Sequence, residues 1–407
     1  MKFDTYFTMN EDQAAQYASQ KFGHMFEPGH RVTCKEIGDG NLNYIFRITD
    51  EVSSFSIIIK QSGPVARISD EFKLSPDRNR IEYEILKLEE TLAPGLVPKV
   101  YAYDPIMNCT VMDDLSDHQI MRKALMEFKT FPKFAHDISD FMVNTLLLTT
   151  DVVLEHKHKK ELVKNFINPQ LCEITEDLVY TEPFNDYKQR NDVFELNRAW
   201  VKEHIYDSRP LNLETAKLKF EFMNHAQALV HGDLHTGSIF VKEDSTKVID
   251  PEFAFFGPIG YDVGNVVANL IFAWVHSDAH QRLEHKKWLE DTLVETVDLF
   301  IEKFQKAWDR NVSEVSAKTP GFKEYYLQMI MRDTAGVTGL ELCRRIIGLA
   351  HVKDITSLKG KVRMRAERIC LTSAIRYILD REKYMCGTDF LETVIACESE
   401  FARENDE

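Results

Sequence analysis

Two acidic segments of this sequence could carry chemistry. Residues 231–235 (His-Gly-Asp-Leu-His) follow the apolar run 228–230, and residues 250–252 (Asp-Pro-Glu) follow the apolar pair 248–249. If both apolar runs are strands, the carboxylates stand at neighbouring strand ends. Phosphoryl transfer needs such a set, because one carboxylate accepts the proton of the attacking hydroxyl and others hold the Mg²⁺ that neutralises phosphate charge. A single Asp in a polar loop is more often a turn or cap residue, so support has to come from other segments.

A glycine-bearing hairpin is expected near the N-terminus. The pattern predicts strands at 32–37 and 44–48, joined by a turn that contains Gly38 and Gly40. Glycine lets backbone N–H groups approach a phosphate without interference from a Cβ atom. Such a turn is usually only a hairpin, and Asp39 adds a negative charge that a phosphate would not favour.

A lysine and a helix follow this hairpin. A strand over 55–59 ends at Lys60, and a helix over 78–90 carries Glu82 and Glu84 in its first turns. In kinases, a strand lysine contacts the α- and β-phosphates and is fixed by a helix carboxylate. An isolated lysine at a strand end is usually solvated. Here, the order of hairpin, lysine, helix glutamate, Asp233 and Asp250 is the order found in kinases.

Several motifs make the resemblance specific. They are residues 38–43, 112–116, 229–240, 250–258 and 341–351. In this order and along nearly the whole chain, the sequence resembles the 5-methylthioribose kinase family, within the aminoglycoside phosphotransferase and choline kinase group of protein-kinase-like folds. The resemblance implies an α+β, bilobal fold. The change from strand-rich to helical patterns predicts an N-terminal lobe over 1–115, with a helical extension at 1–25, and a helical C-terminal lobe over 116–407.

Two positions depart from the wider group. Ser238 stands where the common loop ends in an Asn that helps to hold metal, so that ligand is expected to be missing. Glu252 is then the expected replacement, since Asp250 and Glu252 together offer two carboxylates. Both departures fit the methylthioribose kinase pattern and argue against an aminoglycoside or choline kinase.

The resemblance implies ATP and Mg²⁺ as cofactors and assigns roles to named residues. Asp233 would be the base, Asp250 and Glu252 would hold Mg²⁺, and Lys60 would grip the phosphates with Glu82 or Glu84 as its partner. The segment 112–116 would be the hinge that binds adenine through backbone groups. The nucleotide-binding residues predicted in this way are Gly38, Gly40, Asn43, Lys60, Glu82, Asp113, Asp114, Leu115, Asp250, Pro251 and Glu252.

Arg344 and Arg345 have two interpretations. They could lie on an exposed helix face, where Glu341 forms an i,i+4 pair with Arg345 worth a few tenths of a kcal/mol. Their apolar neighbours argue instead for a largely buried helix, on which two adjacent guanidinium groups need an anion. The family resemblance favours a role in binding the substrate together with Asp233.

The function implied is transfer of the γ-phosphoryl group of ATP to the 1-hydroxyl of 5-methylthioribose, as in methionine salvage. One alternative is another small-molecule kinase of the same group, acting on an aminoglycoside or a choline-like amine. The other is a catalytically dead kinase fold that serves as a binding module. Retention of Lys60, Asp233, Asp250 and Glu252 speaks against the second alternative.

Composition limits the remaining possibilities. The formal net charge of −15 argues against nucleic acid as a partner, since binding to a phosphate backbone needs excess Lys and Arg. The seven cysteines form no close metal-type pairs, which favours a reducing compartment. The most apolar segment, 266–275, is about half the length of roughly 20 residues that a membrane span needs. We therefore expect a cytoplasmic protein without a membrane partner, and the resemblance suggests a homodimer.

One tempting metal motif receives a simpler interpretation. His156 and His158 lie among lysines in residues 155–160. The adjacent positive charges favour a solvated basic helix face over a metal site.

Overall fold

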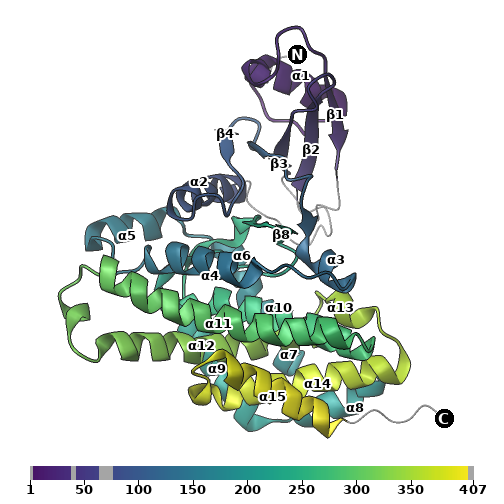
Figure 1. Cartoon of the computed structure of the whole chain (residues 1–407), viewed down its shortest axis with the longest axis vertical. Helices are drawn as coiled ribbons and strands as arrows, with labels where there is room; N and C mark the ends of the chain where they lie inside the picture. The colour runs from purple at the N-terminus through teal and green to yellow at the C-terminus, as the bar shows by residue number, and fades with distance from the viewer. Residues whose placement is uncertain (1–2, 38–42, 64–76, 402–407) are drawn as a thin grey trace. The chain divides into compact units, whose positions relative to one another are not determined.

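The computed structural model describes residues 3–37, 43–63 and 77–401 (Figure 1). The chain divides into two compact units. The first consists of Met1–His118 and Lys247–Ala254, and the second of Gln119–Thr246 and Phe255–Glu407. The segment Lys247–Ala254 therefore brings Asp250 and Glu252 into the same unit as Lys60, although about 190 residues separate them in sequence.

The first unit is built on a five-stranded antiparallel sheet in the order β1-β2-β3-β5-β4. The strands are β1 (Val32–Glu36), β2 (Asn43–Asp50), β3 (Ser56–Ser62), β4 (Val100–Asp104) and β5 (Cys109–Asp113). The central strand β3 is buried along almost its whole length, as its run of three isoleucines suggests. This burial fixes the backbone from which Lys60 projects.

Two helices accompany the sheet. Helix α1 (Glu11–Phe22) begins at a capping box, in which Asn10 and Gln13 bond each other's backbone N–H groups. It contributes Tyr17 and Ala18 to the core that Phe46 and Ile57 also form. Helix α2 (Asp77–Leu92) packs against β4, β5 and the turn at residues 251–253.

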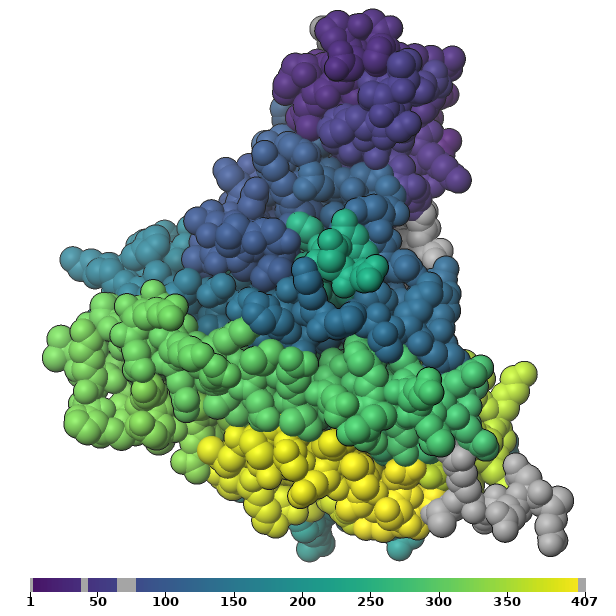
Figure 2. All heavy atoms as spheres, viewed as in Figure 1, coloured from purple at the N-terminus to yellow at the C-terminus, as the bar shows by residue number. Residues whose placement is uncertain are grey.

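The second unit is mainly helical. Its helices are α3 (Met121–Met126), α4 (Phe134–Met142), α5 (His156–Asn165), α6 (Pro169–Leu178), α7 (Glu182–Asn185), α8 (Arg198–Val201), α9 (Arg209–Asn224), α10 (Ile259–Ala279), α11 (Leu283–Asn311), α12 (Phe322–Ile347), α13 (Lys353–Thr356), α14 (Gly360–Leu379) and α15 (Gly387–Glu400). Figure 1 shows α11 extending along this unit with α15 beside it, and in Figure 2 these two helices form adjoining bands of the visible surface.

Helix α10 is the centre of the second unit and is buried along nearly all of its length. It packs closely on α12, and two glycines allow this approach. A Cβ atom on Gly260 would lie 2.5 Å from the backbone nitrogen of Thr334, and one on Gly264 would lie 2.7 Å from the Thr334 carbonyl oxygen. The contact fixes α12, which carries Glu341, Arg344 and Arg345, against α10.

Short strands flank the two acidic segments. Strand β7 (Ala228–Val230) pairs with β10 (Phe255–Gly257), whereas β9 (Ser245–Val248) belongs to a sheet with β8 (Ile239–Lys242) and β6 (Gln119–Ile120). The apolar run before Asp233 is thus a strand, β7, as predicted, whereas only Val248 of the run before Asp250 lies in a strand, at the end of β9. Strands β7 and β9 belong to different sheets, so they are not hydrogen-bonded neighbours.

The remaining predicted elements agree with the structure. The helix expected over 78–90 is α2, and the strand expected over 55–59 is β3, which continues past Lys60 to Ser62. In the second unit, α4 is followed by a π-helical turn, Val143–Leu147. The predicted α+β class is confirmed. Among the described residues, no helix is both long and apolar enough to span a membrane.

Candidate active site

Lys60 on β3 pairs with two carboxylates of its own unit. Its Nζ lies 2.7 Å from Oε1 of Glu82 on α2, and it also bonds Oδ1 of Asp250. Lys60 and Glu82 are buried, whereas the Asp250 side chain is 42% exposed. The sequence did not decide whether Glu82 or Glu84 pairs with Lys60, and in the structure the partner is Glu82. Glu84 points to Arg80 instead, at 2.7 Å.

The charges around Lys60 reinforce one another. Burial alone would lower the pKa of Lys60, but Asp250, Glu82 and Glu252 raise it above its usual value, so the ammonium group stays charged. Burial raises the pKa of Glu82 to about 7; Lys60 opposes this rise, and Asp250 and Glu252 add to it. The described carboxylates here thus repel one another and would gain from an additional cation.

Asn43 and Arg78 both contact the carboxylate of Glu252. Its Oε2 accepts a hydrogen bond from Nδ2 of Asn43 at 3.3 Å and lies 3.3 Å from Nε of Arg78. Arg78 is buried and also donates to Oδ1 of Asn43 at 3.1 Å. Arg78 was not among the predicted site residues. We call Asn43, Lys60, Arg78, Glu82, Asp250 and Glu252 the Lys60 group.

The donor set of this group fits Mg²⁺. Asp250 has a left-handed backbone (φ 61°), and Pro251 begins the short 3-10 turn Pro251–Phe253 that carries Glu252. The described residues contain no cluster of three or more His, Cys, Asp or Glu side chains arranged to hold a metal. Mg²⁺ is commonly bound by one or two carboxylates, with water and substrate phosphates as the other ligands, so two carboxylates suffice.

The predicted hinge, residues 112–116, lies in the first unit. Its acidic side chains form hydrogen bonds and an ion pair with residues of that unit. Asp113 accepts a hydrogen bond from the backbone N–H of Lys99 at 2.9 Å, and Asp114 lies 2.8 Å from Nε of Arg47. The carbonyl of Leu115 accepts a bond from the backbone N–H of His118. The predicted glycines Gly38 and Gly40 lie outside the described residues.

In the second unit, Asp262 holds the loop that carries Asp233. Its carboxylate accepts hydrogen bonds from the backbone N–H groups of His231 (2.7 Å) and Gly232 (3.0 Å). Gly232 has φ 83°, which glycine adopts without strain. Asp262 stands in the first turn of α10 and is buried. Sequence reasoning missed it, although an Asp that opens an otherwise apolar helix is a usable signal.

Arg344 and Arg345 lie between two carboxylates. Nη2 of Arg344 is 3.2 Å from Oδ1 of Asp233, and Nη2 of Arg345 is 3.7 Å from the same atom. Glu341 contacts both arginines: its Oε1 lies 2.9 Å from Nε of Arg345, and its Oε2 bonds Nε of Arg344.

The arginine side chains are only 13% and 9% exposed, and that of Glu341 is 1% exposed. The alternative of an exposed helix face is therefore wrong. The i,i+4 pair considered from the sequence exists, but it is buried and includes a second arginine. We call Asp233, His235, Glu341, Arg344 and Arg345 the Asp233 group.

The surroundings of Asp233 keep it ionised. Burial would raise the pKa of its carboxyl, but His235, Arg344 and Arg345 lower that pKa well below the usual value. In the same way, the two arginines lower the pKa of Glu341 against the effect of burial. Two carboxylates and two guanidinium groups thus form a balanced cluster.

Arg122 on α3 braces the same loop from another side, and sequence reasoning missed it. Its Nε donates to Oγ1 of Thr236 at 3.2 Å, and its Nη2 donates to Oδ1 of Asn269 at 2.9 Å. Nδ2 of Asn269 in turn donates to Oε1 of Glu341 at 3.5 Å. The sequence contained one signal of this network: Asn265 and Asn269 lie one turn apart in an apolar helix, where polar side chains need hydrogen-bond partners.

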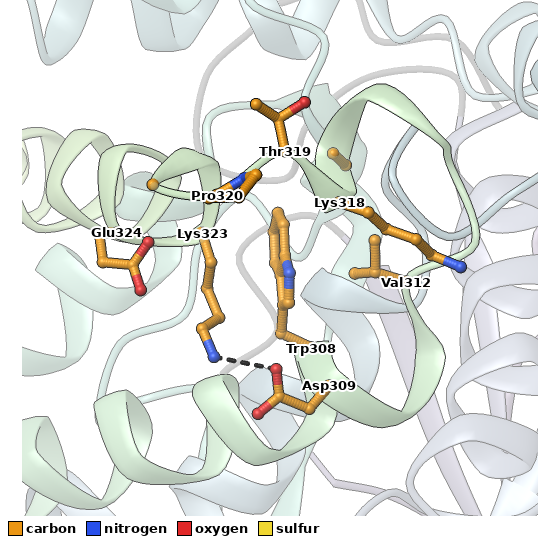
Figure 3. A pocket seen from close by; sticks show the side chains of 10 residues that line it. Trp308, Asp309, Val312, Lys318, Thr319, Pro320, Lys323 and Glu324 are labelled. Atoms are coloured by element: carbon orange, nitrogen blue, oxygen red, sulfur yellow. Dashed lines mark hydrogen bonds and ion pairs between the residues drawn. The ribbon is translucent and has the colours of Figure 1, made fainter.

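A surface cavity at the start of α12 contains none of the predicted site residues. Figure 3 shows Trp308 at its centre, with Nζ of Lys323 paired to Oδ1 of Asp309 at 2.9 Å. Lys323 and Asp309 thus pair with each other, and the cavity contributes no residue to the two groups described above.

Known proteins resemble the chain along most of its length. A methylthioribose kinase of Geobacillus kaustophilus (strain HTA426) is 43% identical over 368 residues, which cover 90% of this chain and 91% of the relative. A methylthioribose kinase of Geobacillus thermodenitrificans (strain NG80-2) is 40% identical, covering 95% and 96%. The chain belongs to the methylthioribose kinase family. It is therefore a kinase, an enzyme that transfers a phosphoryl group.

Two broader comparisons agree with this family. Residues 168–294 match the model of the phosphotransferase enzyme family. The solved structure of a choline kinase from Cryptosporidium parvum Iowa II is similar, with a TM-score of 0.50, 11% identity and 96% of each chain covered. At this identity the likeness concerns the fold alone. The predicted protein-kinase-like fold, with a strand-rich N-terminal lobe and a helical C-terminal lobe, is confirmed.

Proposed function

We propose that this kinase transfers the γ-phosphoryl group of ATP to the 1-hydroxyl of 5-methylthioribose, giving 5-methylthioribose 1-phosphate and ADP in methionine salvage. The observation that carries this proposal is the arginine pair that Glu341 holds against Asp233. Sugar hydroxyls can accept hydrogen bonds from guanidinium groups, which have donors only. The name of the relatives supports the same acceptor.

The Lys60 group would bind the nucleotide. Lys60, held by Glu82, would contact the α- and β-phosphates, and Asp250 and Glu252 would hold Mg²⁺. When bound, this ion would neutralise charge on the β- and γ-phosphates. Arg78 and Asn43 would keep the Glu252 carboxylate in one orientation.

The remaining predicted nucleotide contacts involve mainly backbone. Gly38, Gly40 and Asn43 would cover the phosphates, and backbone groups of Asp113, Asp114 and Leu115 would bind adenine. Pro251 would fix the turn between the two metal-binding carboxylates. The side chains of Asp113 and Asp114 already bond within their own unit, which leaves recognition to the backbone.

The Asp233 group would bind and activate the acceptor. Asp233 would accept a hydrogen bond from the 1-hydroxyl and take its proton as the oxygen bonds to phosphorus. Because its pKa is lowered, Asp233 is a weak base, and orientation of the hydroxyl would be the larger part of its effect. Arg344 and Arg345 would bind sugar oxygens and balance charge on the transferring group.

The alternative acceptors fit this group less well. Aminoglycosides and choline are cations, and this cluster offers them no surplus carboxylate, because Arg344 and Arg345 already balance the charges of Asp233 and Glu341. A coupled assay of ADP formation with 5-methylthioribose, ribose, kanamycin and choline tests which acceptor the enzyme phosphorylates. Turnover with methylthioribose alone supports the proposal, and NMR of the product identifies the phosphorylated hydroxyl. Turnover with kanamycin or choline but not with methylthioribose would overturn it.

We also propose that the chain acts as a homodimer in the cytoplasm. The family resemblance supports the dimer, and the seven cysteines, all unpaired, fit a reducing compartment. Light scattering of the purified protein tests the dimer: a mass of one chain across the working concentration range would contradict it.

A further inference from the structure

His235 lies two residues after Asp233, and its hydrogen bonds define which ring nitrogen carries the proton. Its Nδ1 lies 3.0 Å from the backbone nitrogen of Gly237 and 3.1 Å from that of Ser238. Backbone N–H groups can only donate, so Nδ1 is the acceptor and a neutral ring carries its proton on Nε2.

The protonated nitrogen points to the candidate base. Nε2 of His235 lies 3.3 Å from Oδ2 of Asp233, while Oδ1 of Asp233 faces Arg344 at 3.2 Å. The two carboxylate oxygens thus have separate partners. Without His235, rotation about the Cβ–Cγ bond of Asp233 would no longer be opposed at Oδ2.

The loop is also shaped around the imidazole ring. A Cβ atom at Gly237 would lie 2.7 Å from Cε1 and 3.0 Å from Nδ1 of His235. Oγ of Ser238 lies 3.3 Å from Nδ1 as well. The serine that stands in place of the common Asn therefore contacts the histidine.

We propose that His235 is a positioning residue for phosphoryl transfer, whose Nε2–H group holds Oδ2 of Asp233 and so orients this carboxylate toward the acceptor hydroxyl. The proposal rests on the function proposed above for Asp233. A merely structural role would be different: the ring would only satisfy the backbone N–H groups of Gly237 and Ser238.

Two substitutions separate these roles, because each retains one side of the ring. His235→Asn can place an oxygen near the Nδ1 position and keep the loop bonds, but it is too short to reach Asp233. His235→Gln can place an amide N–H group near the Nε2 position and keep the bond to Asp233, but it loses the loop acceptor. Gly237 and Ser238 remain unchanged in both variants.

The positioning role predicts opposite rankings of activity and stability. His235→Asn should lower kcat by about 10-fold or more, the scale of one hydrogen bond to a charged group, with KM values for both substrates within a few-fold of wild type. His235→Gln should keep more of kcat while showing the lower melting temperature. If kcat instead follows melting temperature across the two variants, the role is structural and the proposal is wrong.

A double variant provides a second criterion. In the Asp233→Asn background, adding His235→Asn should have little further effect on kcat, since the oriented carboxylate is already absent. Multiplicative losses would overturn the proposal. The kcat values of these variants are measured with whichever acceptor of the panel the wild-type enzyme phosphorylates. The panel itself shows whether the methylthioribose assignment fails, before any His235 variant is tested.

Discussion

The Lys60 group and the Asp233 group differ in charge balance. Among the described residues, the Lys60 group contains three carboxylates, Glu82, Asp250 and Glu252, against the two cations Lys60 and Arg78. The Asp233 group contains the carboxylates of Asp233 and Glu341 against the guanidinium groups of Arg344 and Arg345. With Glu82 ionised, the described residues of the Lys60 group carry one excess negative charge, whereas the charges of the Asp233 group balance.

This difference agrees with different ligands. In the Lys60 group, carboxylates outnumber cations, and one of them, Asp250, is partly exposed. Such a group favours a divalent cation, which can in turn bind phosphates. A neutral, buried cluster gains nothing from a charged acceptor and suits an uncharged sugar. If Asp250 and Glu252 both bind the metal, as proposed, Ser238 need not supply a ligand in this chain.

The largest expected effect tests the centre of the Asp233 group. Asp233→Asn should lower turnover by about 10²-fold or more, since it removes the base and the charge that the arginines face. ATP binding, which we assign to the Lys60 group, should be retained. Turnover near that of wild type, with an unchanged melting temperature, would remove Asp233 from its proposed role.

The arginine pair should give the next largest effect. Arg344→Ala or Arg345→Ala removes charge-assisted hydrogen bonds worth about 1.5–3 kcal/mol, which corresponds to roughly 10- to 150-fold in methylthioribose turnover. ATP affinity should change much less. Arg310→Ala, an exposed arginine of α11, is the matched control. If both variants fold and match Arg310→Ala in sugar saturation curves, the arginines do not bind the acceptor.

The excess negative charge of the Lys60 group predicts a smaller effect on metal dependence. Glu252→Gln keeps the size of the side chain and an oxygen for Asn43 but removes one charge, so half-maximal activity should need roughly 10-fold more Mg²⁺. Glu84→Gln, which alters only the pair with Arg80, serves as the control. An unchanged Mg²⁺ titration would leave Glu252 as a structural partner of Arg78.

Periodicity predicted much of the first unit and could have predicted more. Glu82 lies one turn from the buried residues Arg78 and Leu86 of α2, whereas Glu84 lies on another face. The 3.6-residue period of the helix alone could therefore have chosen between the two glutamates as the partner of Lys60. Such local patterns define elements and their buried faces well.

Other features depend on contacts that no local pattern contains. Arg344 meets Asp233 across 111 residues of sequence, and the apolar neighbours of Arg344 indicate only that it is buried. The basic run 155–160 was expected to be a solvated face, but Lys159 is buried. Its ammonium group donates to the carbonyl oxygens of Ala226 and Gln227 at 2.7 and 2.8 Å. Only tertiary structure provides these acceptors.

The smallest expected effect concerns pH and compares the two groups directly. The pKa of Asp233 is lowered relative to about 3.9 in an unfolded chain, so its carboxylate stabilises the folded state above that pH. This contribution is lost only as pH falls through the lower folded-state pKa. Protonation of Asp233 should therefore lower kcat only below about pH 4, and this fall is the acidic limb of the pH profile. Arg344→Ala removes one of the charges that lower the pKa, so this limb should move to higher pH.

The measurement is kcat at saturating Mg²⁺ and ATP from pH 8 down to the pH at which each enzyme unfolds, for wild type, Arg344→Ala and Glu252→Gln. Saturation keeps the Lys60 group in one liganded state, so a shift that appears with Arg344→Ala but not with Glu252→Gln arises from the Asp233 group. Equal acidic limbs in all three enzymes would mean that Arg344 does not control the ionisation of Asp233. If Glu252→Gln moved the limb as far as Arg344→Ala, the shift could not be assigned to the charge that Arg344 places beside Asp233.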